Sequence, residues 1–117
     1  MNEKEFFKEV IKNFPELKND ILSWEKDLPH LRMSEIATYT RKLFEGNKQE
    51  NLLKIIDFIE NLIPHANEKL YNTIGVSFVE DLVFHFKDTQ RDEIVKLLKP
   101  EMTSMYESLK PIFDKDK

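Results

Sequence analysis

The hydrophobic pattern of the chain centres on the stretch from Asn67 to Phe86. At about 100° per residue, its apolar positions fall on one side of a helix of about five turns. These positions are Tyr71, Ile74, Phe78, Val79, Leu82 and Phe86. Val76 and Val83 widen the stripe, so this helix needs neighbours on more than one side. We predict that it is the central helix of an all-α domain.

The residues before Arg32 predict two helices and a loop. Asn2 and Glu5 have the spacing of a capping box, and apolar residues then recur at helical spacing at Phe6, Phe7, Val10, Ile11 and Phe14. Pro15 closes this helix or opens a second one, whose stripe consists of Leu17, Ile21, Trp24 and Leu28. The segment Leu28–Arg32 breaks the pattern and predicts a loop whose two leucines pack into the core.

The middle of the chain predicts a helical hairpin. Ser34 is a candidate N-cap of a third helix, whose inward positions are Ile36, Tyr39, Thr40, Leu43 and Phe44. Gly46 stands where a left-handed C-terminal cap is expected. After the short turn at Gly46 and Asn47, a fourth helix carries Leu52, Ile55, Ile56, Ile59, Leu62 and Ile63. A short turn favours an antiparallel arrangement of the two helices. Asn67 is then the candidate N-cap of the central helix.

The C-terminal part predicts two further helices. Thr89 is a candidate cap for the first, and Pro100 suits the first turn of the second, which presents Met102 and Met105. Pro111 is expected to end that helix near Lys110. We predict one domain over residues 1–113 and a charged tail over residues 114–117. Six or seven helices then form an irregular bundle; their paired spacing is also typical of stacked helical hairpins, although no motif repeats at a fixed period.

Composition and charge narrow the function classes. The 117 residues include no cysteine and only two glycines, which argues against disulfide frameworks, thiolate metal sites and all-β folds. The net charge of −4 divides evenly, with −2 in residues 1–63 and −2 in the remainder. A concentrated positive footprint for nucleic acid is therefore missing. With no signal-peptide pattern and no apolar run of about 18 residues, we expect a cytoplasmic protein with no membrane partner.

Candidate catalytic groups are few. His30, His65 and His85 lie in different segments and have no metal-site spacing with one another. Asp81 and His85 are four residues apart, which favours a surface ion pair over a metal site or an acid–base pair. No glycine-rich phosphate loop and no nucleophile elbow are present. We expect no cofactor, no metal and no enzymatic activity.

Off-stripe apolar residues suggest a partner-binding surface. Phe84 lies on the polar side of the central helix beside Glu80, and Leu53 lies on the Glu60 side of the fourth helix. Either a second layer of helices covers these residues, or they anchor a partner. The same two interpretations apply to Met102 and Met105, and for these residues filling of the core is favoured over contact with a partner.

Three segments carry a resemblance to a known group of proteins. They are Val76–Leu82, Leu43–Asn47 and Leu97–Met102, which together cover about a third of the chain. They resemble a family of short, uncharacterised bacterial helical proteins, which are similar to immunity proteins encoded beside toxins. This resemblance implies a cytosolic, non-enzymatic inhibitor that binds one toxin domain, and it supplies no catalytic residue.

The sequence therefore favours a cytosolic protein-binding domain, with a toxin-neutralising immunity protein as its specific form. Phe84, Glu80 and Leu53 are its candidate partner-binding residues. A helical adaptor or homo-oligomeric scaffold is the alternative, and a small-ligand protein or an enzyme comes third. Both a monomer and a homodimer are compatible with this pattern.

Overall fold

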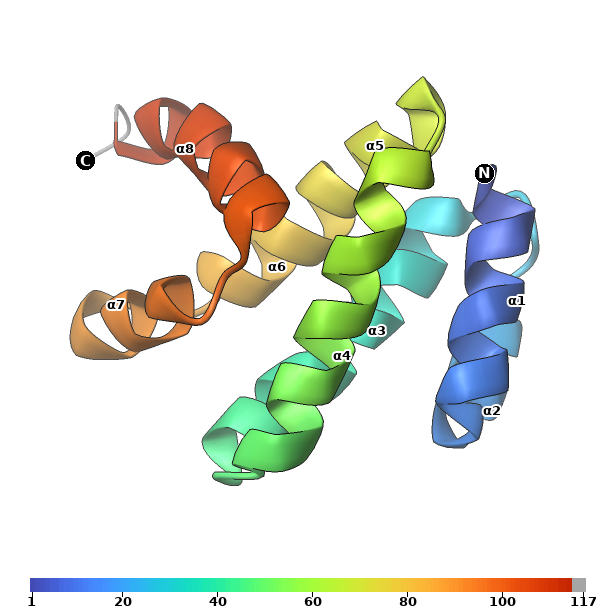
Figure 1. Ribbon diagram of the computed structural model, residues 1–117, viewed down its shortest axis with the longest axis horizontal. Coiled ribbons are helices and arrows are strands. Elements are labelled where there is room, and N and C mark those ends of the chain that lie inside the picture. The colour runs from blue at the N-terminus through green and yellow to red at the C-terminus, as the bar shows by residue number, and fades with distance from the viewer. Residues whose placement is uncertain (115–117) are drawn as a thin grey trace.

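The computed structural model describes the backbone of residues 1–114 and the side chains of residues 1–112. Within that range every regular element is helical, which confirms the predicted all-α class (Figure 1). The elements are α1 (Glu3–Asn13), η1 (Pro15–Leu17), α2 (Lys18–Leu22), α3 (Pro29–Glu45), α4 (Gln49–Leu62), η2 (Ile63–His65), α5 (Glu68–Ile74), η3 (Gly75–Val79), α6 (Glu80–Val83), α7 (Asp88–Lys96) and α8 (Pro100–Asp114). Because α5, η3 and α6 follow one another without a break, we call them together the central rod.

Local capping fixes several helix starts at the predicted residues. The Asn2 side chain accepts a hydrogen bond from the Glu5 backbone N–H at 2.9 Å, and the Glu5 carboxylate accepts one from the Asn2 N–H at 3.1 Å. Asn67 accepts from the Leu70 N–H at 2.8 Å and caps α5. These bonds satisfy N–H groups that have no partner within the helix. Pro100 begins α8, as predicted.

The central rod lies in the middle of the bundle. Figure 1 shows α1 and α2 at one end of the molecule and α7 and α8 at the other, with α3, α4 and the rod between them. The buried residues of the rod are Leu70, Thr73, Ile74, Ser77, Phe78, Val79, Leu82 and Val83. Tyr71 and Val76, which the pattern places on the buried stripe, are instead 37% and 47% exposed. The neighbouring helices cover a face centred on Phe78, and those two side chains lie at its margins.

The rod contains a π-helical segment, η3, in which the Glu80 N–H donates to the Gly75 carbonyl five residues earlier. A π turn holds more residues than an α turn, so it rotates the side chains that follow it. The uniform helix expected for Asn67–Phe86 is therefore only partly correct. The local winding changes in the middle, and the helix ends at Val83.

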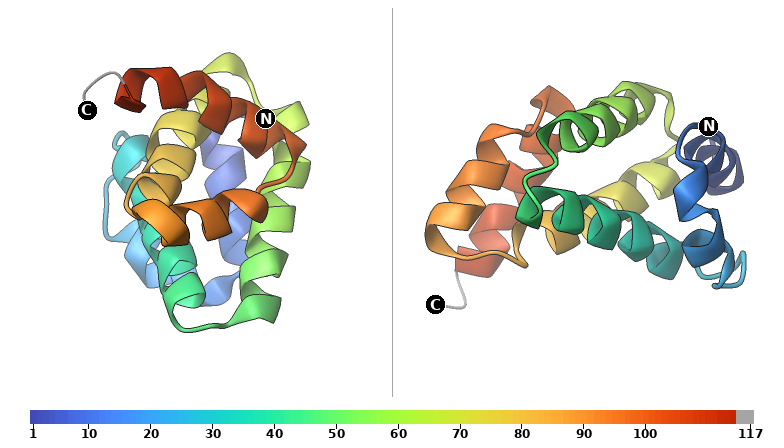
Figure 2. Two further views of the ribbon diagram at one scale, coloured as in Figure 1. Left: turned by 90° about the vertical axis from the view of Figure 1, so that its left-hand side faces the viewer. Right: turned by 90° about the horizontal axis from the view of Figure 1, so that it is seen from below.

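The predicted antiparallel hairpin is formed by α3 and α4, which diverge from their connecting turn (Figure 2). The turn differs in one detail from the expectation. Gly46 has φ −86°, and the positive φ of 56° belongs to Asn47. Asparagine tolerates this left-handed conformation better than other non-glycine residues.

Three predictions about residues 22–34 are wrong. The second helix ends at Leu22, so Trp24 and Leu28 do not continue its stripe. The expected loop Leu28–Arg32 is helical from Pro29 onward, because Pro29 occupies the first turn of α3, where its lost N–H needs no partner. Ser34 therefore lies inside the helix and does not cap it.

At the C-terminal end, two predictions about helix ends are wrong and one about the core is confirmed. Thr89 does not cap α7, which begins at Asp88 after the extended residue Lys87. Pro111 lies inside α8 rather than ending it. It is exposed, so water can replace the backbone hydrogen bond that proline cannot make. Met102 and Met105 are buried, which confirms core filling. Of the predicted charged tail, residues 115–117 lie outside the described residues.

Candidate functional site

A polar seam joins α3 to the central rod. His30 Nδ1 and Ser77 Oγ form a hydrogen bond of 2.6 Å, and the Ser34 hydroxyl donates to Asp81 Oδ2 at 2.7 Å. Further along, an Arg41 Nη1–H donates to the Asp81 carbonyl at 3.0 Å. The three α3 residues share one helix face, because they are four and seven residues apart. The seam therefore sets the position of α3 along η3 and α6.

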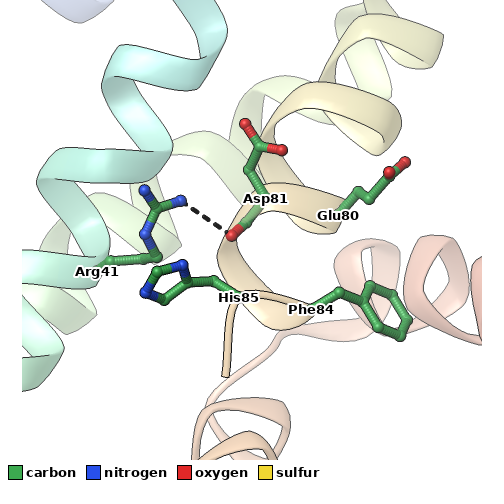
Figure 3. Close-up of a pocket in the computed structure, with 5 residues that line it drawn as sticks. All are labelled: Arg41, Glu80, Asp81, Phe84 and His85. Atoms are coloured by element: carbon green, nitrogen blue, oxygen red, sulfur yellow. Dashed lines mark hydrogen bonds between the residues drawn. The ribbon is translucent and has the colours of Figure 1, made fainter. Parts of the chain in front are cut away.

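The seam ends at a hollow of about 390 Å³. Its lining consists of Arg41 from α3 together with Glu80, Asp81, Phe84 and His85 (Figure 3). Besides its bond to Asp81, Arg41 donates from Nη2 to Thr38 Oγ1 at 3.1 Å. The Asp81 carbonyl belongs to the last turn of α6, so Arg41 satisfies an acceptor that the helix leaves unpaired. The guanidinium group is thereby fixed at the edge of the hollow.

Phe84 is half-buried, and aromatic and cationic groups from α7 and α8 contact it. Its ring stacks on Tyr106 with the centroids 5.7 Å apart, and the Arg91 guanidinium carbon lies 5.0 Å from the Phe84 centroid. Glu80 lies beside Phe84 in the hollow, so two of the three predicted partner-binding residues come together. Leu53, on α4, is 38% exposed and does not line the hollow.

The ion pair predicted between Asp81 and His85 does not form within the described residues. α6 ends at Val83, so His85 lies beyond the helix and the spacing of four residues no longer brings the two groups together. The Asp81 carboxylate instead accepts the Ser34 hydroxyl, as described above. The ring of His85 packs edge-on against Phe86, with the centroids 5.1 Å apart.

Burial and charge raise the pKa of Glu80. The main cause is the partial loss of hydration around its carboxylate, and the negative charge of Asp81 adds to it. The ionised form is therefore less favourable in the folded protein than in the unfolded chain. This group contributes stability below the ordinary glutamate pKa, and the contribution is lost as pH rises through the higher folded-state value.

The Glu80→Gln variant is accordingly expected to be more stable than the wild type at pH 7, because glutamine does not ionise. At pH 4 the difference should shrink, since Glu80 is then largely protonated in both states. Urea unfolding at the two pH values measures this difference. Glu107→Gln, at an exposed position of α8, is the control. Its stability relative to the wild type should show no comparable increase when the pH is raised. A Glu80→Gln variant less stable than the wild type at pH 7 would contradict the assignment.

A second candidate site lies at the connection between α2 and α3. Trp24 is 36% exposed, and Leu28 and Leu31 are each 39% exposed. The indole Nε1–H donates to Glu35 Oε1 at 3.2 Å. Arg32 donates from Nε and Nη2 to the Trp24 carbonyl at 2.9 and 2.7 Å. We call these five residues the Trp24 surface.

The Trp24 surface combines one face of α3 with Trp24 and Leu28, which precede the helix. Leu31, Arg32 and Glu35 lie three, four and seven positions after Leu28, and Trp24 is hydrogen-bonded to Arg32 and Glu35. This face lies about a third of a turn from the His30–Arg41 seam. The sequence analysis missed the site because Trp24 and Leu28 fit an extended second helix. The available signal was Pro29, which starts a helix more readily than it sits in a loop between two helices.

A family model described as "Domain of unknown function (DUF7674)" matches residues 7–113. The chain belongs to this family. The matched range runs from α1 into the last turn of α8 and contains both candidate sites. Comparison with curated proteins and with solved structures gives no match.

Two further observations concern this DUF7674 member. Across residues 1–114, no helix combines the length and apolar character needed to cross a membrane. Among residues 1–112, whose side chains are described, no three or more histidine, aspartate or glutamate side chains are grouped so that they could hold a metal ion.

Proposed function

We propose that this protein is a non-enzymatic protein-binding domain whose partner docks on the Trp24 surface. The observation that carries the proposal is the fixed, half-exposed indole of Trp24. Tryptophan and arginine are enriched among the residues that dominate binding energy at protein interfaces. Here Trp24 precedes α3 and is hydrogen-bonded through its carbonyl to Arg32 on that helix, beside two exposed leucines.

Preorganisation supports this choice of surface. Immobilising a flexible side chain on binding costs about 0.5–1.5 kcal/mol. The three hydrogen bonds to Arg32 and Glu35 already restrain the backbone and ring of Trp24 in the free protein. A partner that covers this face therefore gains apolar contact, and few side chains of the face lose freedom when it binds. Leu22, which is 50% exposed and two residues before Trp24, can extend the contact.

In its specific form, the proposed partner is a toxin domain, and the protein acts as an immunity protein in the bacterial cytoplasm. The support for this form is the resemblance carried by Val76–Leu82, Leu43–Asn47 and Leu97–Met102. A net charge of −4 adds modest support, since it favours association with a basic partner. A homo-oligomeric scaffold is the alternative, in which a second copy covers the same face.

Trp24→Ala is expected to weaken partner binding at least tenfold, the effect of losing about 1.4 kcal/mol. Affinity capture from the source cells with wild-type and variant protein identifies partners whose recovery depends on Trp24. Titration of the purified partner then measures the two dissociation constants. Trp24 is the only tryptophan of the chain, so its fluorescence reports directly on the surface. Binding should shift the emission to shorter wavelength and protect the indole from quenching by acrylamide.

The matched control is Val76→Ala, which removes an exposed apolar side chain from η3 and should bind as the wild type does. Leu31→Ala tests the surface without touching the hydrogen bonds of Trp24. A partner bound equally by the wild type, Trp24→Ala and Leu31→Ala would overturn the docking site. Light scattering that shows a dimer dispersed by Trp24→Ala would favour the scaffold. Unchanged toxin resistance in cells that lack the protein would overturn the immunity form.

A further inference from the structure

The charged side chains of the hollow at the end of α6 are not equally satisfied. Arg41 donates to the Asp81 carbonyl and to Thr38, and the Asp81 carboxylate accepts the Ser34 hydroxyl. Among residues 1–112, the Glu80 carboxylate has no such partner. Of the three charged side chains that line the hollow, Arg41 and Asp81 therefore have internal hydrogen-bond partners within the described residues, and Glu80 does not.

The surrounding groups leave Glu80 accessible to a ligand. Figure 3 shows Glu80 and Phe84 extending from α6 on the side away from Arg41, whose guanidinium points to the Asp81 carbonyl. The other nearby cation, Arg91, lies over the Phe84 ring and donates from Nε to the Phe86 carbonyl at 2.9 Å. Neither arginine is bonded to Glu80, so its charge stays available for an external cation.

We propose that this hollow binds a guanidinium group, such as an arginine side chain presented by a partner. Two parallel N–H donors of a guanidinium match the two oxygens of a carboxylate, and the group is more weakly hydrated than an ammonium. A volume of about 390 Å³ accommodates the planar group and its aliphatic stem. The raised pKa of Glu80 is consistent with a carboxylate that lacks a counter-charge in the free protein.

This site is separate from the Trp24 surface. It lies at the opposite end of α3 and beyond the polar seam, so it can be tested without knowing the docking partner. If one protein covers both sites, an arginine at the hollow adds specificity and a faster, salt-dependent association. If the Trp24 surface has no partner, the hollow still retains its affinity for the cation.

The test titrates N-acetyl-L-argininamide into the full-length protein and follows backbone amide resonances by NMR. Residues 80–85 should show saturable shifts. N-acetyl-L-citrullinamide, which has nearly the same shape without the charge, should cause no saturable shift at equal concentration. Glu80→Gln should weaken argininamide binding about tenfold or more, because a charge-assisted hydrogen bond is lost. Glu50→Gln, on α4 and outside the lining of the hollow, should leave the binding unchanged.

Equal shifts with argininamide and citrullinamide would overturn the proposal, as would a Glu80→Gln variant that binds like the wild type. N-acetyl-L-lysinamide distinguishes the two kinds of cation and should bind more weakly. If it bound as tightly as argininamide, the assignment to a guanidinium would be wrong. Because Glu80→Gln is expected to stabilise the fold at pH 7, a loss of binding in this variant does not reflect unfolding.

Discussion

Replacing Phe78 with alanine is expected to lower the free energy of unfolding by about 3–5 kcal/mol. Phe78 is fully buried in the middle of η3, the part of the central rod that packs against both α3 and α8. Alanine would remove the apolar contacts of the ring and leave a cavity that two neighbouring helices can fill only partly. Urea unfolding followed by circular dichroism at 222 nm measures the change.

Val76→Ala is the matched control for this loss, because it truncates a side chain of the same segment that is 47% exposed. Its effect should stay within about 0.5 kcal/mol, the usual range for surface changes. The two variants together separate burial from any effect on the π turn itself. A loss below about 1.5 kcal/mol for Phe78→Ala would contradict the central position of the rod.

Removing the carboxylate of Glu60 is expected to cost about 2 kcal/mol. This side chain extends from α4 to the start of α8, where Oε2 accepts from the Glu101 N–H at 2.8 Å and Oε1 from the Met102 N–H at 3.1 Å. Both donors belong to the first turn of α8 and have no partner within that helix. The negative charge also interacts favourably with the positive end of the helix dipole.

Asp57→Ala is the control, because it removes an exposed carboxylate from the same helix, α4. Its unfolding midpoint should remain close to that of the wild type. Glu60→Gln should fall between the wild type and Glu60→Ala, since an amide offers one acceptor oxygen but not two. If Glu60→Ala and Asp57→Ala had equal stability, the hydrogen bonds from α8 to Glu60 would not stabilise the fold.

The helices could be predicted where a local interaction decides them. The Asn2–Glu5 capping box and the Asn67 cap involve residues three positions apart, so their spacing in the sequence is already the spacing of the bonds. The first-turn position of Pro100 follows in the same way from the chemistry of proline. Pro29 obeys the same rule, but the break in the hydrophobic pattern at Leu28–Arg32 led to a loop being predicted there.

The candidate sites could be predicted only in part. Glu80 and Phe84 are neighbours on one helix face, and the sequence correctly put them side by side. Their surroundings depend on Arg41, Arg91 and Tyr106, which come from other helices. The Trp24 surface was missed for a related reason. Whether an apolar side chain is covered depends on which helices pack over it, and periodicity alone does not contain that information.

The sequence by itself determined the helical class, several helix starts and most of the residues that form the core, because these follow from side-chain periodicity and capping over a few residues. Only the tertiary structure decided the π turn at Gly75–Val79, the exposure of Trp24 and the hollow beside Glu80. These features arise where separate helices meet. Their energies depend on contacts between residues as far apart in the chain as His30 and Ser77.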